Sequence, residues 1–278
     1  ILDERGLTKR LGYDGRIITG QGINELNNAL VGDRLGFIIS RIEKLIYDTT
    51  FDLKTHQGNV IINTSIIDKN DIDRTLEIIR HIICSDYPIS PYMKLIEEGT
   101  ITSDFRIPEG KIGLATMCSI TVDGILLKNG IPVNTRYGGI LAVKDKKPDH
   151  FEDIIIYNGT TVDPMRIFIS RKMTRVLDTV DKGSGKLLAN LREIPASALS
   201  EAEKLLESVM RYRIGGIARV GEPGFPVFNA PVDKGKVGVV VYAGVNAMAA
   251  VEETGIKVNT YPISTVMDFK ELKMLDSY

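Results

Sequence analysis

Apolar and polar residues follow the same order in two parts of the chain, residues 111–135 and 236–260. Each part opens with a continuous apolar run, continues through small and apolar residues, and reaches a glycine that precedes a second apolar segment. A short apolar run is typical of a buried strand, and a glycine after a helical stretch is typical of a helix end. Each part therefore predicts a strand, a helix and a strand in the form of a right-handed crossover. The strands are expected at 112–117 and 237–242, the helices at 121–128 and 247–254, and the last strands from Ile131 and Ile256.

These two parts are copies at a constant offset of 125 residues. Seven of the 25 aligned positions are identical, whereas roughly one or two would be expected by chance at average composition. Weaker matches continue upstream, where residues 60–63 pair with 187–190. The two repeats are expected at about 33–145 and 160–270, a size typical of a duplicated small domain. A binding site can lie once in each repeat or at the seam between them.

The upstream part of each repeat is predicted with the help of the other copy. Residues 181–185 form a strong turn signal, which favours a hairpin of strands at 172–180 and 186–194. The matching strands are then 42–51 and 59–67, although helical periodicity alone also fits 41–47. Helices are expected at 71–84 and 198–210. The fold class is therefore α+β, with two tandem β-β-α-β-α-β repeats and mixed sheets.

The first thirty residues differ from the repeats. Residues 11–19 predict a two-stranded wing with a turn at Asp14-Gly15. A helix starts after Thr19, in a Thr-x-x-Gly-x-x-Glu-Leu pattern that ends at Leu26 and is typical of the end of a winged-helix domain. An ordinary hairpin and helix is the alternative. The expected division is a winged-helix part at 1–30 and a regulatory part at 31–278, and the first residue, Ile1, suggests a longer protein.

Composition narrows the class of protein. The formal net charge is −1, so no global field attracts nucleic acid or a membrane surface, although a local basic patch stays open. The chain has only two cysteines, too few for a disulfide framework, which favours a reducing, intracellular and cytoplasmic setting. No apolar run reaches the roughly 18 residues that a membrane span requires.

No strong catalytic or metal-binding motif is present. The three histidines, His56, His81 and His150, lie in different segments without the spacing of metal ligands. Cys118 has no evident histidine partner, and Asp123 is the nearest acid that could act with it. Neither a catalytic site nor a metal site is predicted.

The best candidate site is formed by the two turns that lead from a strand into a helix. Such a turn presents free backbone N–H groups, which together with the helix dipole suit a carboxylate or phosphate. Polar side chains there could instead serve only to cap the helices. Arg136, which occurs in the first copy only, is a candidate carboxylate fork or an ordinary surface arginine, and Arg192 is a weaker candidate. The predicted ligand-binding residues are Cys118, Ser119, Thr121, Arg136, Gly244 and Asn246.

Several strings together resemble a known family. The end of a wing and helix is followed by Leu35–Tyr47, by the segment Thr50-Phe-Asp52, by the duplicated block with Cys118, and by the connector Gly221-Glu-Pro-Gly224. In this order they resemble the NrpR nitrogen-regulation repressors of methanogenic archaea, over nearly the whole chain.

The resemblance implies a repressor of nitrogen-assimilation genes that senses 2-oxoglutarate. It also implies a homodimer or larger homo-oligomer that binds operator DNA through a complete winged helix, so that DNA binding by residues 1–278 alone is not expected. No cofactor is implied, and Cys118 with its neighbours is the implied effector site. Two other readings stay open from the residues, namely an enzyme that acts on a small anionic metabolite and a purely structural dimerisation module.

Overall fold

The computed structural model describes residues 2–3, 6–10, 12, 15–22, 37–85, 87, 89–102 and 106–275. The chain divides into two compact units, residues 1–37 and residues 38–278, and each is described by itself.

In the first unit, a small antiparallel hairpin precedes a helical turn. Strands β1 (Thr8–Arg10) and β2 (Arg16–Ile18) pair so that Thr8 lies opposite Ile18. The hydroxyl of Thr19 accepts a hydrogen bond from the Gly22 amide at 2.9 Å, which is how a helix start is capped. The two-stranded hairpin is therefore confirmed, although its first strand lies before the expected segment 11–19. Asp14 and residues 23–36 lie outside the described residues, so the expected turn at Asp14 and the rest of the helix stay predictions.

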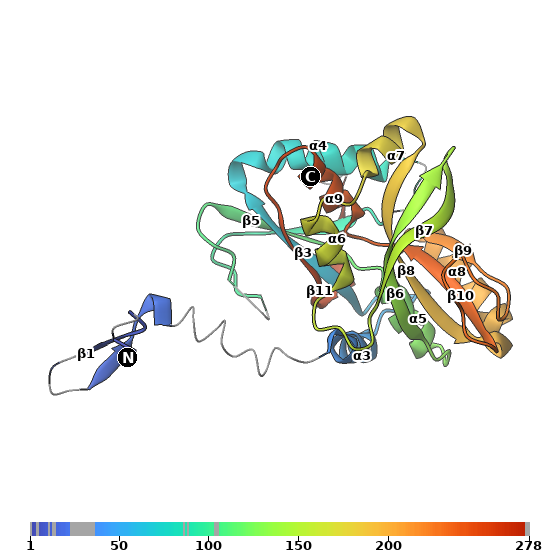
Figure 1. The fold of residues 1–278 in the computed structure, drawn as a ribbon, viewed down its shortest axis with the longest axis horizontal. Coiled ribbons are helices and arrows are strands. Elements are labelled where there is room, and N and C mark those ends of the chain that lie inside the picture. The colour runs from blue at the N-terminus through green and yellow to red at the C-terminus, as the bar shows by residue number, and fades with distance from the viewer. Residues whose placement is uncertain are drawn as a thin grey trace. The chain divides into compact units, whose positions relative to one another are not determined.

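The second unit is built on two five-stranded sheets (Figure 1). All strand pairs recorded within them are antiparallel, so the expected mixed sheets were wrong on this point, while the α+β class with two repeats is confirmed. One sheet has the order β11-β3-β5-β4-β12, and the other has the order β7-β6-β8-β10-β9. The strands of the first repeat are β3 (Asn59–Asp68), β4 (Tyr92–Ile96), β5 (Lys111–Met117), β6 (Asn134–Lys144) and β7 (Lys147–Ile156), and those of the second are β8 (Gly185–Pro195), β9 (Ile217–Val220), β10 (Lys236–Tyr242), β11 (Asn259–Asp268) and β12 (Lys273–Met274).

The two repeats exchange their final strands. Strand β6 of the first repeat pairs with β8 of the second, with Thr135 opposite Arg192. In the same way β11 of the second repeat pairs with β3 of the first, with Thr260 opposite Ser65. The strand–helix–strand segment therefore does not return to its own sheet, and the expected crossover was wrong. Each sheet contains three strands of one repeat and the last two strands of the other, which leaves neither repeat able to close its sheet alone.

Helices fill the spaces between and beside the sheets (Figure 1). Helix α9 of the second repeat packs on α4 of the first, and α5 of the first packs on α8 of the second. The helices are α3 (Ile38–Asp48), α4 (Ile72–Ile83), α5 (Thr121–Lys128), α6 (Pro164–Ser170), α7 (Val176–Lys182), α8 (Leu199–Arg211) and α9 (Asn246–Glu253), with short 3-10 turns η2 (Lys69–Asp71), η3 (Ala196–Ala198) and η4 (Phe269–Glu271).

The strands expected at 42–51 and 172–180 were wrong, because these segments lie mainly in helices. Ile42, Leu45 and Ile46 are the buried residues of α3 and have the i, i+3, i+4 spacing of one helix face. The turn signal at 181–185 marks a helix end: Gly183 adopts φ +72° and follows α7 directly. The other expected helices and strands were predicted correctly, except that the final strands begin three residues late, at Asn134 and Asn259. Helix α6 and strand β7 were not predicted.

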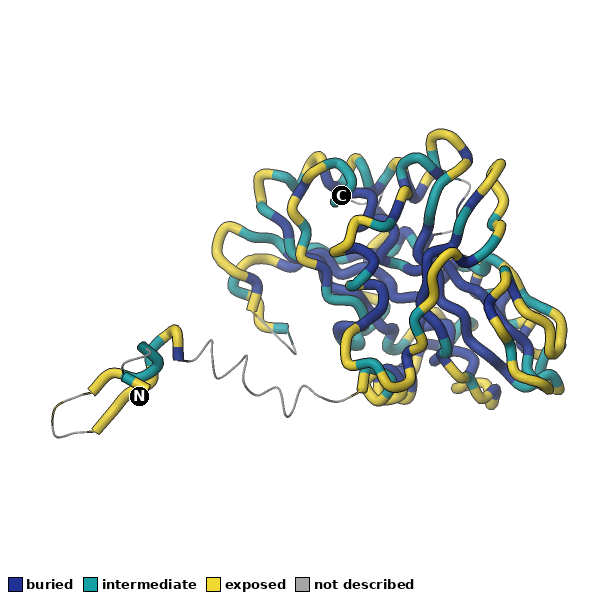
Figure 2. The backbone as a smooth tube through the Cα atoms, viewed as in Figure 1, coloured by how far each residue is buried: buried dark blue, intermediate teal, exposed yellow. Residues whose placement is uncertain are grey.

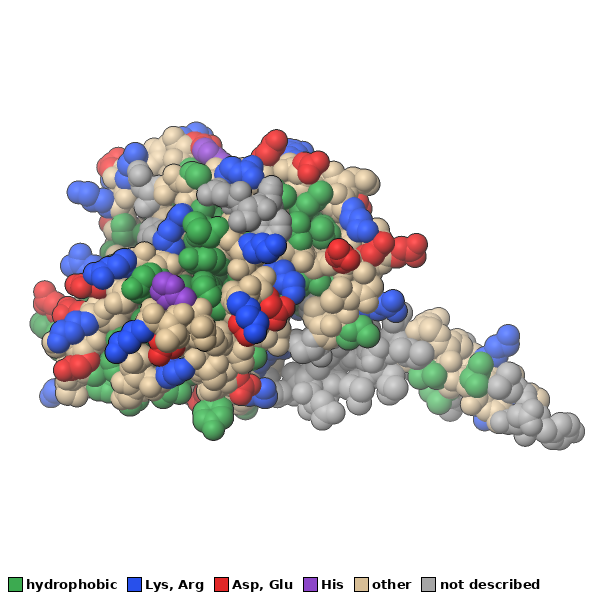
Figure 3. Space-filling view, turned by 180° about the vertical axis from the view of Figure 1, so that it is seen from behind, with side chains coloured by type: hydrophobic (Ala, Val, Ile, Leu, Met, Phe, Trp, Pro, Cys, Tyr) green, Lys and Arg blue, Asp and Glu red, His purple; other side chains and the backbone are tan. Residues whose placement is uncertain are grey.

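The core is shared between the repeats. Buried residues follow the strands of both sheets and the helix faces that cover them (Figure 2). One apolar cluster joins Val122 and Leu126 of α5 to Val237, Val239 and Val241 of β10. The surface in the view of Figure 3 carries Lys and Arg side chains among Asp and Glu side chains, as the net charge of −1 suggests.

Two equivalent side chains tie the start of a helix to a strand in each repeat. The Thr121 hydroxyl accepts from the Ile61 amide at 3.0 Å and donates to the Ile61 carbonyl at 3.1 Å. Asn246 occupies the matching position, accepts from the Leu188 amide at 2.8 Å and donates to the carbonyls of Leu188 and Ala243. Both side chains are fully buried, so these bonds satisfy backbone groups that water does not reach.

We expect the substitution Asn246→Ala to lower the free energy of unfolding by about 2–4 kcal/mol, because it leaves several buried backbone groups without partners. Thr121→Val should cost about 1–3 kcal/mol for the same reason. Urea denaturation measures both, with Asn70→Ala, an exposed position, as a control that stays within about 0.5 kcal/mol of wild type. Variants as stable as the control would show that the two clamps do not hold the helices.

Candidate functional site

The two predicted turns meet at the seam between the repeats. A Cβ atom added to Gly244 would lie 1.9 Å from the carbonyl oxygen of Met117, so only glycine permits this contact. Cys118, Ser119 and Gly244 line one small cavity there. The structure thus brings together three of the six predicted residues, from both copies.

This cavity is small. Its volume is about 10 Å³, which holds about one water molecule. Ile120, Val245 and Ile263 contribute apolar side chains to its wall. A dicarboxylate therefore fits only if the two turns move apart.

Polar side chains from both repeats surround the cavity. Asn190 donates to the Ser119 hydroxyl at 2.7 Å and accepts from the Tyr157 hydroxyl at 2.8 Å. Asn63, the equivalent of Asn190, accepts from the Ile263 amide at 3.1 Å and donates to the Met117 carbonyl at 3.3 Å. Both asparagines are almost fully buried. The signal that could have found them is an asparagine inside an apolar strand at the same position of each copy.

Cys118 contributes a neutral thiol. Burial raises the pKa of Cys118 to about 12, so the thiolate does not form near neutral pH. The hydroxyl of Tyr157 is also buried, which raises its pKa well above the usual range. Both groups can donate or accept hydrogen bonds at the cavity without carrying charge.

Asp163 is a buried acid that was not predicted. It caps α6 by accepting from the amides of Met165 and Arg166. Burial raises its pKa to about 6, and its charge acts on Cys118 and Tyr157, which places it near the cavity. Its Oδ2 atom has no hydrogen-bond partner among the described residues.

The other predicted residues lie elsewhere. Thr121 and Asn246 form the two clamps and do not line the cavity. Arg136 binds Glu193 and Asp233, each at 2.6 Å. The carboxylates of Asp233 and Glu193 raise the pKa of Arg136 further above its already high value. Its guanidinium is thus engaged with two acids of the protein and does not line the cavity.

A second arginine is fully buried close to the seam. Arg192 of β8 lies 2.8 Å from Asp123 of α5, which also accepts from Thr135 of β6 at 2.5 Å. None of the three guanidinium nitrogens of Arg192 has a hydrogen-bond partner among the described residues, and only Nε makes the ion pair with Asp123. Arg192 acts electrostatically on Cys118 and Tyr157.

The other half of the molecule replaces this ion pair by neutral residues. Ser65 stands where the second repeat has Arg192, and Met248 stands where the first has Asp123. Thr260, the equivalent of Thr135, forms a hydrogen bond of 3.0 Å with Ser65. Thr135 instead donates to Asp123. The two halves have the same backbone plan and have diverged in charge.

Comparison with known proteins decides the family. A family model described as NrpR regulatory domains NRD1 and 2 matches residues 35–274. The chain belongs to the NrpR family. A ribonuclease R winged-helix domain matches residues 1–26, in line with the expected winged-helix end.

Named relatives agree with this assignment. The chain is 46% identical over 273 residues to the global nitrogen regulator NrpRI of Methanosarcina mazei, which covers 98% of this chain and 84% of the relative. It is 30% identical to the global nitrogen regulator NrpR of Methanococcus maripaludis over 99% of this chain, but it spans only 47% of that protein. A crystal structure of a nitrogen repressor-like protein from Methanococcus jannaschii matches with a TM-score of 0.72 and 28% identity, over 86% of this chain and 99% of the other.

These NrpR relatives are named as regulators, which confirms the expectation that the chain is a regulator and not an enzyme. Within the described ranges, no helix is long and apolar enough to cross a membrane. The described residues also contain no group of three or more His, Cys, Asp or Glu side chains that could hold a metal ion. The boundaries 1–30 and 31–278 stay predictions.

We expect Arg192→Ser and Asp123→Met, made singly, each to lower the free energy of unfolding by about 3–5 kcal/mol, because each leaves a buried charge unpaired. The double variant should recover most of this loss, since it copies the Ser65 and Met248 arrangement of the other half. Chemical denaturation of all four proteins gives the coupling free energy. If the loss of the double variant equals the sum of the two single-variant losses to within about 0.5 kcal/mol, the two residues are not coupled.

We expect Asp163 to make stability depend on pH. Its pKa in the fold, about 6, lies above its ordinary value of 3.8, so the fold favours the protonated acid. The stabilisation is complete below pH 3.8 and is lost as the pH rises through about 6, by roughly 3 kcal/mol. Asp163→Asn retains the helix cap and should remove this dependence. Urea titrations between pH 4 and pH 7 should show the free energy of unfolding of the variant rising relative to that of wild type. A difference between the two proteins that does not change with pH would refute the assignment.

Proposed function

We propose that the chain is the effector-sensing and dimerising part of a transcriptional repressor of nitrogen-assimilation genes, and that it senses 2-oxoglutarate at the seam between the repeats. Membership of the NrpR family supports the regulatory role. The observation that carries the site is the small cavity where Cys118 and Ser119 of one repeat meet Gly244 of the other. A ligand bound there would contact both repeats at once.

The chemistry of the seam suits a dicarboxylate with a ketone. The hydroxyls of Ser119 and Tyr157 and the amide of Asn190 provide neutral donors. A carboxylate also favours a cation. Arg136 is a poor candidate for this cation, because it already pairs with Glu193 and Asp233. Arg192 is the better candidate, because it lies two residues after Asn190 on the same strand face. Its Nη1 and Nη2 atoms also have no partner among the described residues.

Binding requires the cavity to grow, and that requirement can couple the ligand to regulation. Gly244 rests against Met117, so separating the turns moves the two repeats relative to one another. A ligand that binds only the opened arrangement shifts the population toward it. A coupling free energy of about 1–3 kcal/mol between effector and operator is enough for a regulatory response.

Dimerisation and operator binding belong to the same proposal. The match of residues 1–26 to a winged-helix domain supports operator binding through the complete winged helix of the full-length protein. Strand β7 is a long edge strand with exposed side chains at Ile154 and Ile156, and such an edge can pair with a second copy. The copies would then form a homodimer or a larger homo-oligomer in the cytoplasm.

Isothermal titration of the 278-residue chain tests the effector. We expect saturable binding of 2-oxoglutarate and weaker binding of glutamate and succinate. Ser119→Ala should weaken binding by about tenfold through the loss of one hydrogen bond to a charged group. The double variant Asp123→Met with Arg192→Ser should weaken it further while remaining folded.

Ser208→Ala, on the surface of α8, is the matched control and should bind as wild type does. Absence of saturable 2-oxoglutarate binding, or equal affinity in Ser119→Ala and wild type, would refute the seam as the effector site. Light scattering on the same samples tests the dimer.

A further inference from the structure

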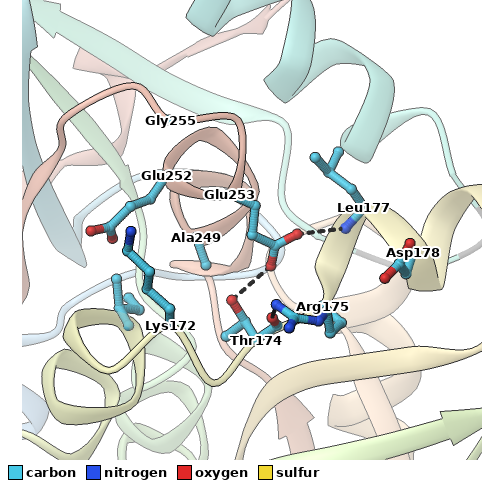
Figure 4. Close-up of a pocket in the computed structure, with 10 residues that line it drawn as sticks. Lys172, Thr174, Arg175, Leu177, Asp178, Ala249, Glu252, Glu253 and Gly255 are labelled. Atoms are coloured by element: carbon cyan, nitrogen blue, oxygen red, sulfur yellow. Dashed lines mark hydrogen bonds between the residues drawn. The ribbon is translucent and has the colours of Figure 1, made fainter.

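A larger cleft lies away from the seam, between helix α9 and the connection from α6 to α7 (Figure 4). Its volume is about 350 Å³, within the range of pockets that hold small molecules. Ile169, Leu177 and Ala249 supply apolar side chains to the wall, and Lys172 and Glu252 supply charges of opposite sign.

The cleft exists because the second repeat departs from the first at this place. In the first repeat α3 runs unbroken, and Thr49 after its end packs on α5: a Cβ atom added to Gly124 would lie 2.4 Å from the Thr49 side chain. In the second repeat, residues 171–175 interrupt the matching helix, and Ala249 replaces the glycine. The interruption leaves open a space that is filled in the first repeat.

One wall of the cleft is firmly held. Glu253 accepts hydrogen bonds from the Thr174 hydroxyl at 2.7 Å and from the amides of Val176 and Leu177 at 2.8 and 3.0 Å. These bonds join the end of α9 to the start of α7 and fix the carboxylate, as the dashed lines of Figure 4 show for Thr174 and Leu177. Glu253 is therefore a structural residue of the cleft.

The charged ends of Lys172 and Glu252 point toward one another at one side of the cleft (Figure 4). Among the described residues neither side chain forms a salt bridge, although the charge of Lys172 acts on Glu252. Burial raises the pKa of Glu252, and the charge of Lys172 offsets part of this rise. Lys172 has a φ of +53°, a left-handed conformation that is uncommon outside glycine.

The position of Glu252 has no explanation in helix stability. It lies in the last turn of α9, where the helix dipole disfavours negative charge. The equivalent residue of the first repeat is Leu127, and that of Glu253 is Lys128. Glu253 joins two helices through its hydrogen bonds. Glu252 lines the cleft.

We propose that this cleft binds a free α-amino acid, with the carboxylate at Lys172, the ammonium at Glu252, and the side chain against Ile169, Leu177 and Ala249. One ligand then pairs with two opposite charges that form no salt bridge with each other. Arg175, at the same wall, adds a second cation for the carboxylate end. A keto acid such as 2-oxoglutarate has no ammonium for Glu252, so the cleft and the seam select different compounds. The bound amino acid would bridge α9 and the α6–α7 connection and give the domain a second nitrogen-related signal.

Isothermal titration of the 278-residue chain tests this proposal with L-glutamine and L-alanine as probes. Propionate carries the carboxylate alone and ethylammonium the ammonium alone, so each should bind at least about tenfold more weakly than L-alanine. Lys172→Met and Glu252→Gln should each reduce amino-acid affinity by at least about tenfold. The same variants should leave the response to 2-oxoglutarate unchanged.

Glu207→Gln, on the exposed face of α8, is the matched control and should bind the amino acids as wild type does. The proposal is overturned if neither probe binds saturably, if propionate binds as tightly as L-alanine, or if both cleft variants match the control. A loss of 2-oxoglutarate binding in Ser119→Ala with intact amino-acid binding would separate the two sites directly.

Discussion

The exchange of final strands between the two repeats is the constraint on which the rest of the structure depends. Strand β6 completes the sheet of the second repeat and β11 completes the sheet of the first, through antiparallel pairing that contains one register shift in each case. An unpaired sheet edge at either place would expose backbone groups that need partners. The repeats therefore form one cooperative unit, and their two strand-to-helix turns are forced together, with Gly244 against Met117. The seam cavity follows from that contact.

Within a shared backbone plan, the two halves have taken different side chains at equivalent positions. The buried pair of Arg192 and Asp123 in one half corresponds to Ser65 and Met248 in the other. A buried ion pair adds little net stability over neutral residues, because removing the two charges from water costs about as much as their attraction returns. Its retention in one half is better explained by a role for charge near the seam. The break between α6 and α7 is a second divergence, and it opens a cleft where the first repeat is tightly packed.

Both divergences lie at or next to elements that pack against the other repeat. The seam joins the two turns, and the cleft joins α9 to the α6–α7 connection while α9 itself packs on α4 of the first repeat. A ligand at either place can act on the relation between the repeats, because packed interfaces have few alternative arrangements. That is the physical property that a regulatory domain of the NrpR family needs.

The sequence by itself determined the duplication, the α+β class, the strands and helices of the repeated block, and the family. Periodicity and the constant offset carry that information locally, and a glycine after a helix can be read without coordinates. It also gave Cys118, Ser119 and Gly244 as candidate residues, but it left open whether a site lies once in each repeat or at the seam. The first element of each repeat was predicted wrongly, since a glycine-rich turn signal fits a helix end as well as a hairpin. Only the tertiary structure decided which sheet each final strand joins, that Thr121 and Asn246 clamp strands, and that Arg136 is held by Glu193 and Asp233. These outcomes rest on contacts between residues far apart in the chain. The packing of the two repeats sets those contacts, and such contacts leave no pattern in the local sequence.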